Sequence, residues 1–186
     1  MMNTGYLTAD RTSSGDEVYT PFYAVEPLLE FLPEDKTIWC PFDEEWSAFY
    51  NLLTEKGYKV VRSSLKEGKD FFTYQPESWD ILVSNPPFSK KNDVLERACK
   101  LGKPFALLLP VNCLQGKKRF EIMGNDIQIL SFDGRIDYHT NNNMKTTTKG
   151  NHFGSAYFCR NILPTKLEIR QLVKYERPLL TERSED

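Results

Sequence analysis

One segment of the chain combines a short apolar run with a stiff, polar loop. Residues 80–84 read Asp-Ile-Leu-Val-Ser, and Asn85, Pro86, Pro87 and Phe88 follow directly. Proline has a locked φ angle and no backbone N–H, so this loop is stiff and presents carbonyl oxygens rather than donors. An ordinary loop is the alternative interpretation, because Pro-Pro breaks regular structure and Asn before Pro favours a turn.

These residue types suit the activation of a planar amine. An exocyclic amine on an aromatic ring is a poor nucleophile because its lone pair is delocalised. The side-chain oxygen of Asn85 and the main-chain carbonyl of Pro86 could accept both N–H bonds and draw the nitrogen toward a tetrahedral shape. Phe88 would stack on the aromatic ring that carries this amine. Such catalysis is mostly positioning and needs no metal.

The Asn-Pro-Pro-Phe motif after a buried strand resembles the catalytic motif of S-adenosylmethionine-dependent amino-methyltransferases. Residues 19–163 resemble the small phage- and prophage-type N6-adenine methyltransferases. The resemblance implies S-adenosylmethionine as cofactor and transfer of a methyl group to the N6 amine of adenine in DNA. RNA adenine or a protein glutamine is an alternative acceptor, and a catalytically idle nucleic-acid-binding module is a further alternative.

The resemblance also implies a cofactor site near the start of the domain. Tyr19 and Thr20 stand where permuted members carry a cofactor motif, although Thr-Pro is also an ordinary helix start. Pro41 and Phe42 would line the pocket, and Asp43 would accept from the amino group of the cofactor. Asp43 could instead cap the next helix. Family members have a Gly-rich turn here, whereas this chain has no glycine between residues 15 and 57.

A second departure follows the next expected strand. The family usually has an acidic residue there for the ribose hydroxyls, but residues 62–64 read Arg-Ser-Ser. Asp70 and Phe71 stand where the family has an Asp-Phe pair that contacts the cofactor's adenine. The resemblance therefore implies Asp70, Phe71 and Asn85 as cofactor-binding residues. A solvated loop acid is the alternative interpretation of Asp70.

Basic and amide side chains follow the motif and are candidates for substrate binding. Lys90 stands two residues beyond Phe88, and Lys117, Lys118 and Arg119 come after a later apolar run. Lysine and arginine at the same sheet edge could contact phosphates, or they could be a solvated helix face. Residues 134–154 form a long polar loop in which Asn142 is a candidate for reading a base edge. The expected partner is therefore nucleic acid, with DNA preferred over RNA.

Apolar runs alternate with amphipathic patterns along the chain and define the elements that must position these residues. Helices are expected at residues 21–32, 44–56, 91–101 and 117–123. Strands are expected at residues 37–40, 58–61, 79–84, 105–111, 127–132, 155–159 and 162–163. This order predicts an α/β fold with a mostly parallel sheet of about seven strands and helices on both faces. The resemblance makes it a Rossmann-like class I methyltransferase fold.

Length and composition fit one globular domain. The 186 residues are 40% hydrophobic, and we expect a flexible N-terminus at 1–16, a domain at 17–174 and a polar tail at 175–186. The four cysteines are widely spaced, and no apolar run reaches about 18 residues. These features predict reduced thiols, no membrane partner and a cytoplasmic location. The two histidines lack metal-ligand spacing, so no metal is expected.

The formal charge of −2 hides an asymmetry. Residues 1–89 carry 15 acidic and 7 basic side chains, whereas residues 90–149 carry 11 basic and 6 acidic ones. The change of sign falls just after Phe88, between the expected cofactor half and the expected substrate half. This distribution favours a polyanion bound on one surface of a nearly neutral protein.

Overall fold

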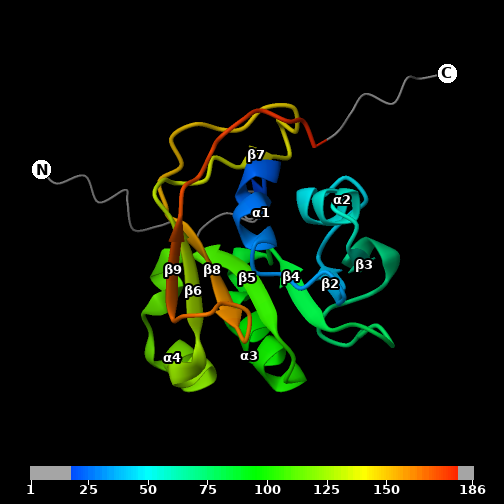
Figure 1. Ribbon diagram of the computed structural model, residues 1–186, viewed down its shortest axis with the longest axis vertical. Helices are drawn as coiled ribbons and strands as arrows, with labels where there is room; N and C mark the ends of the chain where they lie inside the picture. Colours follow the sequence, from blue (N-terminus) through cyan, green and yellow to red (C-terminus); the bar gives the residue numbers. More distant parts are fainter. Residues whose placement is uncertain (1–17, 180–186) are drawn as a thin grey trace, which may run out of the picture.

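The computed structural model describes residues 18–179 and is built around a seven-stranded sheet. The order of the strands is β3-β2-β4-β5-β8-β6-β9 (Figure 1). The strands are β2 (Thr37–Pro41), β3 (Lys59–Ser63), β4 (Ile81–Ser84), β5 (Phe105–Pro110), β6 (Gln128–Phe132), β8 (Ser155–Arg160) and β9 (Leu167–Arg170). β8 is antiparallel to both of its neighbours, and the other pairs are parallel. The predicted α/β class with a mostly parallel sheet is confirmed.

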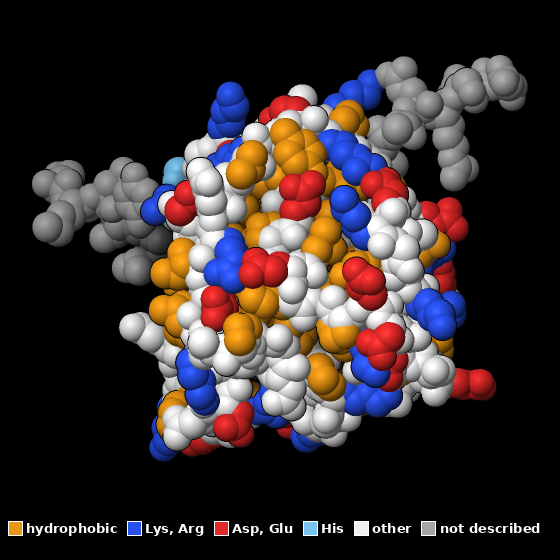
Figure 2. All heavy atoms as spheres, in the orientation of Figure 1, with side chains coloured by type: hydrophobic (Ala, Val, Ile, Leu, Met, Phe, Trp, Pro, Cys, Tyr) orange, Lys and Arg blue, Asp and Glu red, His pale blue; other side chains and the backbone are white. Residues whose placement is uncertain are grey.

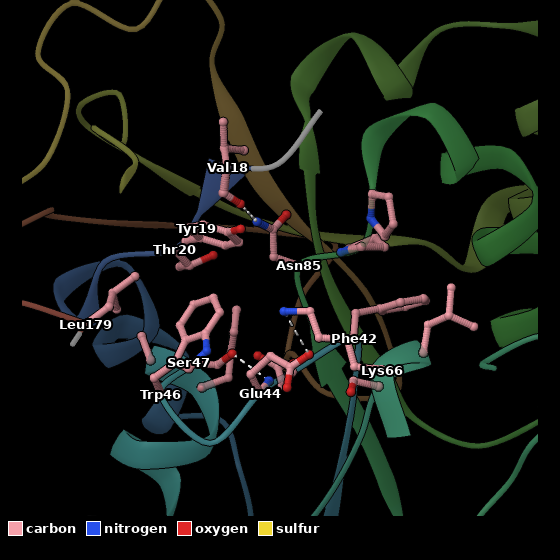
Figure 3. Close-up of a pocket in the computed structure, with 17 residues that line it drawn as sticks. Val18, Tyr19, Thr20, Phe42, Glu44, Trp46, Ser47, Lys66, Asn85 and Leu179 are labelled. Carbon is pink, nitrogen blue, oxygen red and sulfur yellow. Dashed lines mark hydrogen bonds and ion pairs between the residues drawn. The ribbon is translucent and has the colours of Figure 1, made fainter. Parts of the chain in front are cut away.

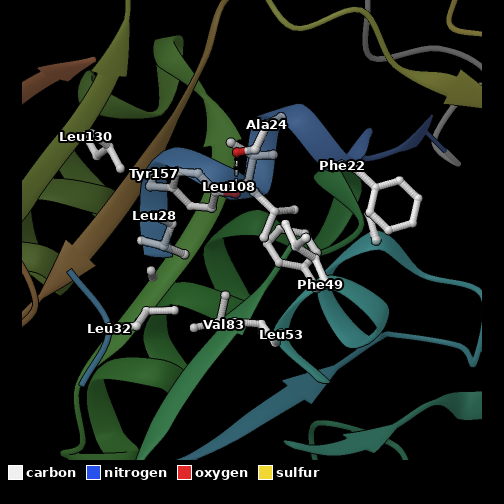
Figure 4. Close-up of a cluster of buried hydrophobic side chains, with 14 of the residues drawn as sticks. Phe22, Ala24, Leu28, Leu32, Phe49, Leu53, Val83, Leu108, Leu130 and Tyr157 are labelled. Atoms are coloured by element: carbon white, nitrogen blue, oxygen red, sulfur yellow. Dashed lines mark hydrogen bonds between the residues drawn. The ribbon is translucent and has the colours of Figure 1, made fainter. Parts of the chain in front are cut away.

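Helices pack on both faces of this sheet because its strands are apolar on both sides. The helices are α1 (Phe22–Leu29), α2 (Ala48–Glu55), α3 (Lys91–Leu101) and α4 (Lys117–Met123). On one face, Leu28 and Leu53 join Val83 in a buried cluster (Figure 4). On the other face, Leu95 of α3 is buried in a second cluster with Leu107. Side chains that alternate along β4 and β5 thus supply two separate cores.

The parallel strands bring the loops that carry the predicted motifs to one edge. β2 lies between β3 and β4, so the chain runs outward to β3 and then returns past β2 to β4. Pro41 pairs with Ser63 at the ends of β2 and β3, and β4 ends at Ser84. The loops after these three strands therefore leave the same edge, where the strand order reverses. Open α/β sheets bind ligands at such a point.

Most of the expected elements are present, with shifted ends. α3 and α4 begin and end as predicted, while α2 begins at Ala48 rather than at residue 44. The strand expected at 162–163 is wrong, because these residues lie in the connection between β8 and β9. β9 was not predicted. Its residues alternate between exposed and half-buried, as is typical of an edge strand, and they form no continuous apolar run.

A second, two-stranded sheet joins the start of the domain to the long polar loop. β1 (Val18–Tyr19) pairs antiparallel with β7 (His139–Thr140). These strands were not predicted, since two residues give no periodic signal. The pairing places part of the loop of residues 134–154 beside the predicted N-terminal cofactor motif. The flexible terminus expected at residues 1–16 lies outside the described residues.

The segment that follows β9 crosses the domain and packs on it. Leu179 is buried, and its N–H donates to the carbonyl of Met144 at 3.0 Å. The Arg177 guanidinium lies 3.7 Å from the centre of the Phe22 ring. Described residues of the tail expected at 175–186 therefore contact α1 and the loop of residues 134–154. Residues 180–186 lie outside the described range.

Neither a membrane-spanning helix nor a disulfide is present among the described residues. No helix among them has the length and apolarity needed to cross a bilayer. Cys40, Cys99, Cys113 and Cys159 are all free thiols, as expected. Burial raises the pKa of each of these thiols, so they are protonated and unreactive near neutral pH.

Candidate functional site

A cavity of about 400 Å³ lies at the edge where β2, β3 and β4 end. Segments 18–20, 42–44, 46–49, 64–66 and 85–87 line it, together with Leu179. In the view of Figure 3, Thr20 and Asn85 lie across the cavity from Glu44 and Ser47. The predicted site residues in its lining are Tyr19, Thr20, Phe42, Asp43, Asn85, Pro86 and Pro87. The fold thus brings the predicted N-terminal motif, the turn after β2 and the Asn-Pro-Pro loop to one cavity.

Asn85 is held in a defined orientation by the first strand. Its amide nitrogen donates to the main-chain carbonyl of Val18 at 3.1 Å (Figure 3). A carbonyl only accepts hydrogen bonds, so the Asn85 side-chain oxygen must face the other way. This oxygen is buried and has no hydrogen-bond partner among the described residues. Asn85 therefore offers a fixed, unused acceptor at the cavity.

The two prolines stiffen the loop beside this acceptor. Pro86 is buried and Pro87 exposed, and neither has an N–H to donate. The Pro87 carbonyl accepts from the N–H of Lys90 at 3.0 Å, and the Phe88 carbonyl accepts from the Lys91 ammonium at 3.2 Å. These bonds close the short helical turn of residues 88–90 directly after the motif.

Phe88 lies outside the cavity lining and packs against the long polar loop. Its ring meets Phe153 edge to face at 5.6 Å and Tyr138 at 6.5 Å between ring centres. Tyr138 and Phe153 stack on each other at 5.9 Å. The loop of residues 134–154 therefore contacts the aromatic residue of the motif, which places this segment next to the predicted catalytic loop.

In the turn after β2, Phe42 adopts a backbone conformation that glycine usually occupies. Phe42 has φ 71°, in the left-handed region that non-glycine residues avoid at a cost of about 1–2 kcal/mol. Its ring packs against Phe71, with 4.9 Å between ring centres. The absent Gly-rich turn is thus replaced by a strained residue that its neighbours hold in place, and such strain is typical of functional sites.

Asp43 is a buried carboxyl in the wall of the cavity. It lies within hydrogen-bond distance of the Ser84 hydroxyl, which also contacts the Pro41 carbonyl. Burial raises the pKa of Asp43 to about 7, although hydrogen bonds from Ser84 and Ser47 lower it. α2 has its N-cap at Ser47, so Asp43 is not the cap of that helix. A cation beside Asp43 would favour its ionised form.

Two further hydroxyls at the cavity have no partner. Thr20 Oγ1 and Ser64 Oγ are buried without a hydrogen bond among the described residues. Buried polar atoms are rarely left unpaired, because each costs about 1–3 kcal/mol. Nearby, Tyr19 and Trp46 meet edge to face at 4.8 Å. The cavity therefore combines unused polar atoms with an aromatic wall, as small-molecule sites do.

Three predicted cofactor residues lie outside the cavity lining. Pro41 ends β2 and is buried in the sheet. Phe71 belongs to the second core, where it packs on Trp39 and Phe42. The Asp70 carboxylate accepts from the N–H of Phe72 at 3.0 Å and so stabilises its own turn. These residues support the cavity wall rather than face the cavity.

The predicted substrate residues lie in two different situations. Lys90, Lys117 and Lys118 are exposed, and Asn142 is exposed in the long loop. Arg119 instead donates to the carbonyl of Cys113 at 3.0 Å and to the side-chain oxygen of Asn92 at 3.2 Å. Further bonds to the carbonyls of residues 112 and 115 occupy the same guanidinium. Arg119 thus connects the loop before α4 to α3, and its guanidinium has hydrogen-bond partners within the protein without a substrate.

Several residues that line the cavity were not predicted. They include Val18, Glu44, Trp46, Ser47, Ser64, Lys66 and Leu179. Glu44, Trp46 and Ser47 follow Asp43 directly, so a wider window around that turn would have found them. Ser64 belongs to the Arg-Ser-Ser segment that departs from the acidic pattern, and Lys66, two residues further on, carries no signal in the sequence. Leu179 carries no signal in the sequence, because it reaches the cavity through the fold alone.

The described residues contain no group of three or more His, Cys, Asp or Glu side chains arranged to hold a metal ion. His139 is buried in β7, and burial lowers the pKa of its ring, which is therefore neutral near pH 7. A search of protein-family models matches none of them to this chain, and a search of curated proteins finds no similar sequence.

Proposed function

We propose that the protein is an S-adenosylmethionine-dependent methyltransferase that methylates the exocyclic N6 amine of adenine in DNA. The observation that carries this proposal is the buried side-chain oxygen of Asn85, which has no partner among the described residues. The Asn85 amide nitrogen is held by the carbonyl of Val18. Asn85 is followed by Pro86 and Pro87, which lack an N–H. A fixed acceptor beside two residues without an N–H suits an amine whose two N–H groups both donate hydrogen bonds.

The arrangement of the sheet supports a Rossmann-like class I methyltransferase fold. An antiparallel β8 between β5 and β6 interrupts an otherwise parallel sheet. The cavity lies at the carboxyl ends of β2, β3 and β4, where such folds bind nucleotides. We infer the fold family from this combination of strand order and cavity position.

The cavity has the size and chemistry for the proposed cofactor. Its volume of about 400 Å³ falls in the range of small-molecule sites. Asp43 would hold the amino group of the methionine part, Thr20 its carboxylate, and Phe42 the adenine ring. The cofactor, when bound, supplies an electrophilic methyl group on a sulfonium. The unpaired hydroxyl of Thr20 and the buried carboxyl of Asp43 in the cavity wall are the observations that favour this fit.

The residues of the motif would position the amine for in-line attack. The Asn85 oxygen accepts one N–H and the Pro86 carbonyl the other, which localises the lone pair on the nitrogen. Phe88 stacks on the extruded base at a gain of about 1–3 kcal/mol. When the cofactor supplies its methyl group, the oxygens of Asn85 and Pro86 would hold the amine nitrogen in place, and that nitrogen would release one proton to solvent. Because positioning dominates, removal of the Asn85 acceptor acts on the chemical step.

A nucleic-acid partner is supported by local charge only. The exposed Lys90, Lys117 and Lys118 lie in the basic stretch of residues 90–149. Figure 2 shows basic and acidic side chains interspersed over the face that it views. We therefore propose phosphate contacts from these lysines rather than from a broad basic surface. Lysine contacts to phosphate are independent of sequence, so target choice falls to the loop of residues 134–154.

The test is transfer of a labelled methyl group from S-adenosylmethionine to DNA. We expect incorporation by the wild type, a loss of at least about a hundredfold in Asn85→Ala, and normal activity in Asn125→Ala. Asn125 is exposed in the turn after α4 and serves as the matched control. Equal incorporation by the wild type and Asn85→Ala would reject the mechanism.

Two alternative functions are distinguished by further substrates in this assay and by calorimetry. RNA adenine and the glutamine amide also present a planar NH₂, so transfer RNA and a protein extract are assayed beside DNA. The strained Phe42 turn favours the other alternative, an idle nucleic-acid-binding module, because family members have glycine there. Calorimetry with S-adenosylmethionine separates the methyltransferase from the idle module, since stoichiometric binding of the cofactor eliminates the idle module.

A further inference from the structure

The loops that follow β2 and β3 are joined to each other at the cavity. Pro41 and Ser63 pair at the ends of these strands, so the two loops start side by side. Arg62 then bridges Glu45, at 2.9 Å, and Glu67. Arg62 lies in β3, so these ion pairs connect the end of this strand to the loop after β2 and to the loop after β3.

Glu44 carries a carboxylate from the first loop over the end of β3. Its Oε1 lies 3.6 Å from the Lys66 ammonium, two residues beyond Ser64. The N–H of Glu44 donates to the Ser47 hydroxyl at 2.8 Å, which holds the backbone of this residue. The Glu44 side chain is 21% exposed and lines the cavity. The carboxylate therefore faces the cavity from a fixed backbone.

Ser64 supplies a second polar group at the same end of the cavity. Its hydroxyl is buried, lines the cavity and has no partner among the described residues. A carboxylate can accept hydrogen bonds from two hydroxyls at once, and a serine hydroxyl can both donate and accept. A neutral group with two adjacent hydroxyls matches this pair of side chains.

The positive charge of Lys66 beside Glu44 favours a neutral diol over a cation as the ligand group. Lys66 lies beside Glu44 and would repel an ammonium or sulfonium, whereas it leaves a neutral diol unaffected. The other carboxyl of the cavity, Asp43, is buried, and the charges that act on it are those of Glu44 and Arg62. The two carboxyls thus suit different parts of one ligand. Leu65, which is 74% exposed at the cavity, adds an apolar surface for a ring next to the diol.

We propose that Glu44 and Ser64 bind the vicinal hydroxyls of the ribose in a nucleoside ligand. The proposal rests on the proposed function, which supplies such a ligand as the adenosyl part of the cofactor. The carboxylate comes from the loop after β2 and takes the place of an acidic residue at the end of β3. The neighbouring parallel strands make this exchange feasible, because both loops reach the same point.

The experiment is calorimetric titration of S-adenosylhomocysteine and its 2′,3′-dideoxy analogue. We expect the wild type to bind S-adenosylhomocysteine at least about tenfold more tightly than the dideoxy analogue, because the analogue lacks the diol and its hydrogen bonds to a charged group. Glu44→Gln raises the Kd for S-adenosylhomocysteine about tenfold and leaves the Kd for the analogue unchanged. Ser64→Ala acts in the same direction by a few-fold.

Glu77→Gln is the matched control, since it makes the same change in charge at an exposed residue outside the cavity lining. It should bind both ligands as the wild type does, and thermal denaturation checks that each variant is folded. If the wild type binds S-adenosylhomocysteine and Glu44→Gln binds it equally well, the ribose assignment is overturned and the proposed function stands. If the folded wild type binds neither ligand, both are overturned.

Discussion

At the scale of single residues, Asp43 shows how a site side chain is kept at the expense of stability. Its carboxyl is buried at the cavity, and burial raises its pKa from the usual 3.8 to about 7. The ionised form is therefore disfavoured in the folded protein relative to the unfolded chain. A stabilising contribution is fully present below about pH 4 and is lost as the pH rises through about 7. Above pH 7 the charged carboxyl opposes folding unless a cation accompanies it.

Asp43→Asn is expected to remove this pH dependence. At pH 8 the variant should be more stable than the wild type by several kcal/mol, since each unit of pKa difference is worth about 1.4 kcal/mol. At pH 4 the difference should nearly vanish. Urea denaturation at both pH values measures it. A variant that is equally or less stable than the wild type at pH 8 would contradict the buried, raised carboxyl.

At the scale of elements, the turn after β2 explains how a cavity forms without glycine. Phe42 occupies the left-handed region and is anchored by its ring against Phe71. The turn then directs Asp43 inward and Glu44 toward the end of β3. The conformation, rather than the residue type, is what this position requires.

The comparison of Phe42→Gly with Phe42→Ala tests this turn. Both variants lose the ring contacts, so their difference reports the backbone alone. At ordinary positions alanine is the more stable by about 0.5–1 kcal/mol. At φ 71° we expect the reverse, with the glycine variant more stable by about 1 kcal/mol. Chemical denaturation decides, and a more stable alanine variant would show that the turn is unstrained.

The elements also show what the sequence can predict and what it cannot. β5 was predictable because every residue in it is buried and apolar, and α3 because it ends at Gly102 with φ 71°. Asn85 was found because its motif is contiguous. Ser64 was missed as a site residue because its role depends on the pairing of β2 with β3, which no local pattern states. β1 was missed because two residues pair only through the tertiary fold.

At the scale of the whole molecule, distant segments enclose the site. β1 pairs with β7 of the long loop, and Leu179 near the C-terminal end of the described chain reaches the cavity wall. Glu176 binds Thr147 in the same loop, at 3.0 Å between side-chain oxygens. The loop beside Phe88 is therefore held from both ends of the chain, while the basic lysines stand outside this enclosure.

Lysine substitutions test the distribution of charge. Lys117→Ala and Lys118→Ala should each weaken DNA binding by a similar factor on any sequence and lower the slope of log K against log salt by about 1. Lys59→Ala, an exposed change on β3 in the acidic half, should leave both unchanged. Fluorescence anisotropy at several salt concentrations measures these effects. An unchanged slope in Lys117→Ala and Lys118→Ala would exclude phosphate contacts from α4.

The central claim is that the Asn85 loop activates the N6 amine of adenine in DNA. Its most direct test is mass spectrometry of nucleosides from DNA incubated with the protein and S-adenosylmethionine. We expect N6-methyl-2′-deoxyadenosine with the wild type and none above background with Asn85→Ala. Methylation at another position, or the same product from both proteins, would contradict it.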